Sequence, residues 1–306
     1  MQTSPNAHPD VPAKALFDAD FFRLLEGLHL RLQTIVRAGT GGMRSSRQTG
    51  TSVEFSDFRE YAPGDDFRRI DWNAYARFER LFVKLFMEEK QAQVHVLLDA
   101  SASMDNSEYG DANKSQLARR IAGAVAYLAI KRLDCAFLHV LHGAEVRTIG
   151  PLSGRASFYR AAQALEGLQF AGETALSSAL RRIRFSQGGK AVLISDMFST
   201  DDPSEGLKYL QFRGQDASCV HILAPEEIEP PFEGRLRLVD AEGQPHCELT
   251  VTQEARQAYM RALAGFRTDL REALAQRGFM YIPVRADADL LQVLFGDLAR
   301  GGVFGT

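Results

Sequence analysis

The sequence predicts an α/β fold, namely a doubly wound, mostly parallel sheet with helices on both faces, together with an N-terminal helix and a loop-rich segment. Apolar runs without polar alternation occur at 94–98, 191–195 and 217–223, which is typical of parallel strands that are covered on both faces. Helix-like stretches separate these runs, and strands that alternate with helices favour a doubly wound sheet. The 306 residues are enough for one large domain of this kind plus an appended segment.

The N-terminal region, residues 1–90, is expected to form a part of its own before the sheet domain of residues 91–306. Its first element is a helix over 17–36, where apolar residues recur at helical spacing, and we expect this helix to lie outside the sheet domain. A glycine-rich, basic loop follows at 39–50. It lacks the G-x-x-x-x-G-K-[ST] order and no apolar strand precedes it, so a flexible loop is favoured over a nucleotide-binding loop.

Residues 54–77 combine mixed charge with aromatic side chains and show poor helical periodicity. One interpretation is a loop-rich structural module in which Trp72 packs against the sheet domain, and which has too few periodic apolar residues to fold alone. The other interpretation is a docking surface in which Arg59, Arg68 and Arg69 meet an acidic partner. For the three arginines both interpretations stay open.

The elements expected from residue 81 onward follow from apolar spacing and from turn or cap residues. His142-Gly143 is a hairpin-like turn, which makes the strands on either side antiparallel, while Thr252 caps a long helix that Gly278 ends. The predicted order is an edge strand at 81–86, strand 94–98, helix 115–131, strands 135–141 and 144–149, helices 157–168 and 174–184, strand 191–195, helix 203–213, strand 217–223, a hairpin at 235–251, helix 252–277, strand 279–284 and helix 287–300.

Oxygen-bearing side chains occur at or near the ends of the predicted strands. Asp99, Ser101 and Ser103 follow the first buried strand, Thr174 precedes a helix-like stretch, and Asp196 ends the second buried run. The carboxyl ends of parallel strands are where open α/β sheets bind ligands. Carboxylate and hydroxyl oxygens suit Mg²⁺ or Mn²⁺ and, less tightly, Ca²⁺, whereas Zn²⁺ and copper favour His or Cys. The alternative is an ordinary acidic turn, since Asp and Ser are common turn residues.

This set of residues resembles the metal-ion-dependent adhesion site of von Willebrand factor type A domains. The resemblance implies that Ser101, Ser103 and Thr174 are direct or near-direct ligands, and that Asp99 and Asp196 hold coordinated waters. Glu173, beside the threonine, is an unusual neighbour for such a ligand.

A second set of motifs begins in the preceding segment and continues into the turn after the first buried strand. It consists of Glu54-Phe55, Arg59, Tyr61, Gly64-Asp65-Asp66, Arg68, Ile70-Asp71-Trp72, Glu88-Glu89 and Leu98–Met104. By these motifs the chain resembles, over about residues 39–196, the bacterial family known as domain of unknown function fifty-eight, whose members join such a segment to a von Willebrand type A-like domain. Many relatives carry membrane helices before this region, and none is found in this sequence.

Composition limits the partners and the compartment. A net charge of -3 gives no global field for nucleic acid or an anionic membrane. The most apolar stretch, 121–130, has half of the roughly twenty residues that a membrane span needs. Cys135, Cys219 and Cys247 form no C-x-x-C pair, so reduced thiols are expected, and with no export signal in residues 1–12 the predicted location is the cytoplasm.

Other candidate catalytic groups receive little support. His95, His139 and His221 fall inside apolar strands with no second ligand at metal spacing, so they are interpreted as core histidines. No serine is flanked as G-x-S-x-G, and a nucleophilic hydrolase is therefore not indicated.

Two functions remain to be compared. The first is a non-enzymatic binding module whose metal accepts an acidic side chain of a partner protein. Here the family resemblance implies an adaptor or co-chaperone acting with a MoxR-type AAA+ ATPase, which supplies the energy that a chain without a P-loop cannot. The alternative is a metal-dependent hydrolase of a phosphate or peptide substrate, with Asp99 or Asp196 as base. Hydroxyls in place of a carboxylate cluster favour the binding module.

Overall fold

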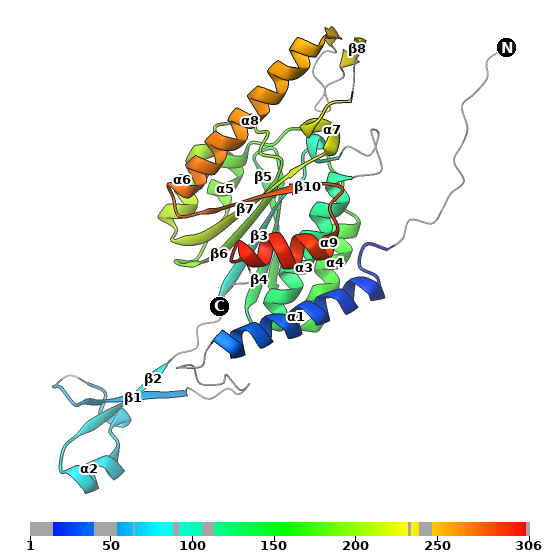
Figure 1. Ribbon diagram of the computed structural model, residues 1–306. Coiled ribbons are helices and arrows are strands. Elements are labelled where there is room, and N and C mark those ends of the chain that lie inside the picture. Colours follow the sequence, from blue (N-terminus) through cyan, green and yellow to red (C-terminus); the bar gives the residue numbers. More distant parts are fainter. Residues whose placement is uncertain are drawn as a thin grey trace. The chain divides into compact units, whose positions relative to one another are not determined.

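The computed structural model describes residues 15–39, 54–63, 65–87, 92–105, 113–231, 234–238 and 247–303. The chain divides into two compact units, one formed by Met1–Gly39 together with Ala92–Thr306 and the other by Thr40–Gln91. The larger unit contains a six-stranded sheet and its covering helices, and the smaller unit contains a two-stranded sheet (Figure 1).

The six-stranded sheet has the order β10-β7-β6-β3-β4-β5. All neighbouring pairs are parallel except β4 and β5, which form the predicted antiparallel hairpin at one edge. The chain leaves the central strand β3 toward β4 and later returns to β6 on its other side, so the winding direction reverses between β3 and β6. The strands are β3 Gln93–Asp99, β4 Cys135–His142, β5 Glu145–Leu152, β6 Gly189–Ser195, β7 Gln215–Leu223 and β10 Met280–Arg285.

Strand β3 is covered on both faces, and this explains why its sequence lacks polar alternation. Val96 and Leu98 point into one apolar core, and Leu97 points into a second core on the opposite face of the sheet. All three side chains are fully buried. Because successive side chains of a strand alternate between faces, a strand covered on both faces needs apolar residues throughout.

Helices cover both faces of the sheet, as predicted (Figure 1). The first core lies beneath α3 and α4, and the second lies beneath α5, α6 and α8. The helices of the first face are α1 Ala19–Gly39, α3 Lys114–Lys131, α4 Arg155–Glu166 and α9 Leu290–Gln292, the last continuing as a π-helix over Val293–Leu298; those of the second are α5 Leu176–Arg182, α6 Pro203–Phe212 and α8 Gln253–Ala275. No helix among the described residues is long and apolar enough to cross a membrane.

Helix α1 corrects an expectation, because it belongs to the larger unit and does not lie outside the sheet domain. Phe21, Leu25 and Leu28 are fully buried in the first core, and Phe21 makes an edge-to-face contact with Phe17. The helical apolar stripe showed that one face of this helix is buried. It could not show that the covering surface is α3, which lies about a hundred residues further on.

A short helix and a hairpin of two strands connect β7 to α8. The short helix α7, Pro225–Ile228, follows β7 directly, and the strands β8, Gly234–Leu238, and β9, Cys247–Val251, pair as the expected antiparallel hairpin. Thr252 caps α8 as predicted, since its side chain accepts a hydrogen bond from the Ala255 backbone N–H.

The smaller unit contains strands β1, Glu54–Glu60, and β2, Phe82–Met87, which pair with each other in antiparallel fashion. Its helix α2, Trp72–Phe78, is capped by Asp71 and has no buried residue. Within the smaller unit the expectation that Trp72 is buried is not met, because the residue is 63% exposed. An aromatic residue at the first position of a short capped helix faces solvent here, and sequence composition alone does not reveal this.

Candidate metal centre

The predicted metal ligands meet at the carboxyl edge of the sheet, between β3 and β6. Asp99 is the last residue of β3, and Asp196 follows the last residue of β6. Both carboxylates are fully buried. The winding direction reverses between these two strands, and the carboxyl ends of the strands at such a reversal are the position at which doubly wound sheets bind ligands.

Asp99 accepts three hydrogen bonds from the protein. Its Oδ1 accepts from the Ser101 backbone N–H at 3.0 Å and from the Thr174 hydroxyl at 2.5 Å. Its Oδ2 accepts from the Ser195 hydroxyl at 2.6 Å. A buried carboxylate needs such partners because it has left water, and these donors hold the Asp99 side chain in one orientation.

Thr174 reaches the site through a loop that is fixed on two sides. Residues 143 and 174 form an isolated parallel bridge, and the Ala102 backbone N–H donates to the Gly172 carbonyl at 2.8 Å. Thr174 is fully buried, whereas Glu173 is exposed. The acidic neighbour therefore faces away from the site, and it does not separate Thr174 from Asp99.

Ser101 and Ser103 lie side by side in the turn after β3. Their hydroxyl oxygens are 3.1 Å apart, and Ser101 is fully buried. Adjacent ligands of an octahedral Mg²⁺, with bonds of about 2.1 Å, are separated by about 3 Å. The spacing of these two hydroxyls therefore fits such an ion.

The donor set as a whole is made of oxygen atoms, which are the ligands that Mg²⁺ and Mn²⁺ prefer. No group of three or more His, Cys, Asp or Glu side chains among the described residues is arranged to hold a metal. This does not conflict with the fit, because three of the five donors here are hydroxyls. The residues present fit a hard divalent cation bound largely by neutral oxygens.

Asp196 has a partner that the sequence did not predict. Its Oδ2 accepts a hydrogen bond from Lys114 Nζ at 3.1 Å, and its Oδ1 accepts from the Phe198 backbone N–H at 3.1 Å. Lys114 is fully buried, and its ammonium also donates to Glu227 Oε1 at 2.6 Å. Nothing in the sequence near Lys114 indicates this role, because its partners lie 82 and 113 residues away.

Burial and charge shift the pKa values of the site. Burial raises the pKa of Asp99 above its usual range, and the neighbouring Asp196 carboxylate raises it further. Burial opposes the charge of Lys114, but the carboxylates of Asp196 and Glu227 outweigh it and raise the pKa of that lysine. Lys114 is therefore a permanent cation, and Asp99 is a carboxylate that would gain from a further positive charge.

The backbone after Asp196 is also unusual. Met197 has a φ of 63°, in the left-handed region that residues other than glycine rarely adopt. Its N–H donates to the Ser195 hydroxyl at 2.8 Å, which in turn donates to Asp99. Ser195 was not among the predicted site residues, although its position beside Asp196 was a signal that could have found it.

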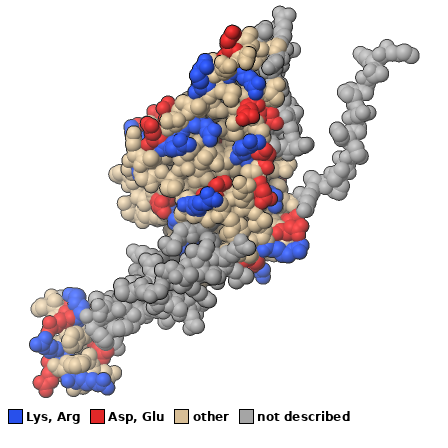
Figure 2. Space-filling view, viewed as in Figure 1, with Lys and Arg blue, Asp and Glu red and all other residues tan. Residues whose placement is uncertain are grey.

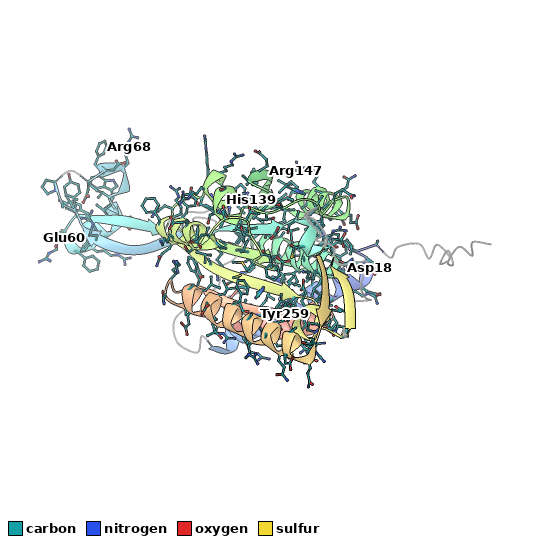
Figure 3. The ribbon with its side chains drawn as sticks, turned by 90° about the horizontal axis from the view of Figure 1, so that it is seen from above. Asp18, Glu60, Arg68, His139, Arg147 and Tyr259 are labelled. Carbon is teal, nitrogen blue, oxygen red and sulfur yellow. The ribbon has the colours of Figure 1, made fainter. Side chains whose placement is uncertain are left out.

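The predicted partner-binding arginines lie in the smaller unit, which is not the unit that holds the candidate ligands. Arg59 Nη2 is paired with Asp65 Oδ1 at 2.7 Å, and Arg68 is exposed. Arg68 and Glu60, both labelled in Figure 3, belong to this unit. Arg69 lies in the short 3-10 turn Phe67–Arg69.

The strand order, with buried carboxylates and hydroxyls at the carboxyl ends of β3 and β6, defines a doubly wound α/β domain. The model of the family described as protein of unknown function DUF58 matches residues 57–269. The match covers more than half of the chain, so the chain belongs to this family, as the sequence motifs predicted.

Similar proteins are known by sequence and by structure. The chain is 27% identical to the uncharacterized protein Rv1480 of Mycobacterium tuberculosis over 250 residues, which are 79% of this chain and 77% of that protein. The conserved hypothetical protein BatB from Bacteroides thetaiotaomicron aligns with a TM-score of 0.42 and 16% identity over 69% of this chain and 98% of that one. The VWA domain of SpRpn10 aligns with a TM-score of 0.41 and 12% identity over 67% and 94%. These structural likenesses are weak and add nothing to the strand order described above.

Proposed function

We propose that the protein is a divalent-metal-dependent protein-binding module. The ion, Mg²⁺ or Mn²⁺, is held by the oxygen donors of the site, and an acidic side chain of a partner protein completes its coordination. These donors are Asp99, Ser101, Ser103, Thr174 and Asp196. The observation that supports this proposal most directly is their convergence beyond the ends of β3 and β6, with the Ser101 and Ser103 hydroxyls 3.1 Å apart.

The charge of the donors favours binding over hydrolysis. Three neutral hydroxyls leave much of the charge of a divalent ion uncompensated, and such an ion attracts a carboxylate. Two-metal hydrolysis uses a cluster of anionic ligands instead, and the described residues contain no group of three or more His, Cys, Asp or Glu side chains arranged for a metal. The types of oxygen donor in this site therefore favour a binding role over hydrolysis.

The partner that we propose is a MoxR-type AAA+ ATPase, for which this chain acts as an adaptor or co-chaperone in the cytoplasm. The family resemblance of the sequence motifs suggests this partner. On the face drawn in Figure 2, acidic and basic side chains are interspersed over the larger unit. A surface with mixed charges produces no strong long-range electrostatic field, so it favours recognition of the partner through a local site.

The test is the affinity of the purified chain for a purified MoxR-type ATPase from the same genome, measured by calorimetry with Mg²⁺ and with excess EDTA. We expect EDTA to weaken the complex at least ten-fold and Asp99→Asn to weaken it to the same degree in Mg²⁺. Asp216→Asn is the matched control, because Asp216 lies near the start of β7 and is mostly exposed. An affinity that EDTA leaves unchanged would exclude the metal-dependent mechanism.

A further inference from the structure

Lys114 is a charged side chain in a position where charges are rarely found. It is the first residue of α3, and its side chain is fully buried. Lysine is almost never fully buried unless it is paired, and a cation at a helix N-terminus also faces the positive end of the helix dipole. Its burial therefore depends on partners, which among the described residues include the carboxylates of Asp196 at 3.1 Å and Glu227 at 2.6 Å.

These partners place the lysine between the candidate metal site and a second element. Asp196 is one of the candidate ligands. Glu227 lies in the short helix α7, which follows β7 in the sequence. Glu227 is itself held by neighbours, because its Oε2 accepts from the Ala224 backbone N–H at 2.7 Å. Its carbonyl oxygen accepts from the hydroxyl of Tyr259, a residue of α8 that is labelled in Figure 3. Glu227 is thus a fixed anion, and the lysine ammonium bridges it to Asp196.

We propose that Lys114 is a resident cation of this site and sets its affinity for divalent ions. The inference rests on the proposed metal-dependent function. Lys114 compensates part of the charge of Asp196, so a divalent ion that binds nearby meets a weaker anion and a like charge at close range. Glu227 acts in the opposite sense, because it adds an anion to the site and holds the ammonium partly away from Asp196.

The two residues therefore have opposite predicted effects. Lys114→Met keeps the length and the apolar stem of the side chain and removes its charge, and the dissociation constant for Mn²⁺ should fall by about ten-fold or more. Glu227→Gln keeps the shape and removes an anion, and the dissociation constant should rise by about ten-fold. A purely structural ion pair gives a different result, because loosening it from either side would disturb the site and weaken binding in both variants.

The experiment is a calorimetric titration of the full chain with Mn²⁺ alone. Lys190→Met is the matched control. Lys190 lies near the start of β6, whereas Asp196 follows the end of that strand. The ammonium of Lys190 pairs with Asp216 and with the Gly302 carbonyl, away from the candidate ligands. This variant should bind Mn²⁺ as the wild type does. Circular dichroism establishes that each variant is folded, and Lys114→Gln, which also removes the charge, takes the place of Lys114→Met if that variant does not fold.

The outcomes separate this inference from the proposed function. Tighter binding by Lys114→Met together with weaker binding by Glu227→Gln supports the role of Lys114, as does binding by Lys114→Met where the wild type shows none. If the wild type binds Mn²⁺ and both variants are unchanged or both are weakened, the role of Lys114 is overturned while the metal site stands. If neither wild type nor Lys114→Met binds at millimolar Mn²⁺, the metal-dependent function and this inference fall together.

Discussion

The Thr174 hydroxyl donates a hydrogen bond to Asp99 Oδ1 at 2.5 Å, across 75 residues of sequence. Both side chains are fully buried, so this charge-assisted bond forms away from water, where it is stronger than at the surface. The bond fastens the loop before α5 to the end of the central strand. The three hydrogen bonds that Asp99 accepts leave one of the roughly four lone-pair sites of its carboxylate, on Oδ2, for an ion or for an ion-bound water molecule. The adhesion-site resemblance implies contact through such a water molecule.

The first prediction concerns the effect of metal on thermal stability. A ligand at about a hundred times its dissociation constant stabilises a protein by about 2.7 kcal/mol. For a domain of this size each kcal/mol shifts the midpoint by about 2–4 °C, so saturating Mg²⁺ or Mn²⁺ should raise the wild-type Tm by roughly 5–10 °C. Asp99→Asn should show almost no shift. Scanning calorimetry measures both, and an equal shift in the variant would argue against the site.

The second prediction concerns the metal-free protein and separates two substitutions of Asp99. Burial and the nearby Asp196 carboxylate disfavour the charged form of Asp99, so Asp99→Asn, which keeps the shape, should leave the metal-free Tm unchanged or higher. Asp99→Ala should lower stability by about 1–3 kcal/mol, because it leaves buried donors without an acceptor. Urea denaturation in EDTA gives both values. A large loss in Asp99→Asn would show that the charge itself stabilises the fold.

The candidate ligands could be predicted from sequence because each lies beside a feature that sequence displays. Asp99 and Asp196 end apolar runs, and such runs appear wherever a strand is covered on both faces. Lys114 could not be predicted, because a lysine at the start of a helix resembles any surface lysine until its distant partner Glu227 is known. The sequence likewise does not show which distant element covers the apolar face of a helix. The apolar stripe of α1 was therefore recognised from the sequence, whereas the packing of α1 in the larger unit was not.

The third prediction concerns the smaller unit. Its short helix α2 has no buried residue, its strands β1 and β2 pair only with each other among the described strands, and an isolated two-stranded sheet is marginally stable in water. A fragment of residues 40–91 should therefore lack a cooperative thermal transition by circular dichroism. The comparison is a chain in which residues 1–39 are joined to residues 92–306 by a short flexible linker, because α1 is part of the core of the larger unit. A sharp transition in the shorter fragment would contradict the prediction that this segment does not fold alone.

Trp72 allows a fourth prediction, because it is the single tryptophan of the chain. With 63% of its side chain exposed, its fluorescence should be that of a water-exposed indole and should be quenched readily by acrylamide. Unfolding in urea should change the emission wavelength little. Emission at short wavelength with poor quenching in the native protein would show instead that Trp72 is covered in solution.

The last prediction concerns pH and rests on three buried histidines. Burial lowers the pKa of His95 to about 4 and that of His221 to about 4. Burial and the nearby His95 lower the pKa of His139, labelled in Figure 3, to about 3. The ring nitrogens of His95 and His139 lie 3.0 Å apart, so both rings cannot be protonated without repulsion. The folded protein therefore keeps these three histidines neutral at pH 5.

In the unfolded chain the same histidines titrate near pH 6.5 and are charged at pH 5. The unfolded state thus binds more protons than the folded state between about pH 4 and pH 6.5, and stability rises with pH across that window. The stabilisation is complete above about pH 6.5, and lowering the pH from 7 to 5 should cost on the order of 1–2 kcal/mol for each histidine. Asp99 and Glu227 act in the opposite sense, because burial raises the pKa of both carboxyl groups in the folded state, but they are two groups against three.

Urea denaturation of the metal-free protein at pH 7 and pH 5 measures this loss of unfolding free energy. His221→Gln is the matched variant, since Gln can still bond to the Tyr281 hydroxyl that lies 2.8 Å from His221 Nδ1. It should reduce the loss between the two pH values by about a third, because one of three contributing groups is removed. Equal or greater stability at pH 5 in the wild type would show that the histidines are accessible to protons in the folded protein.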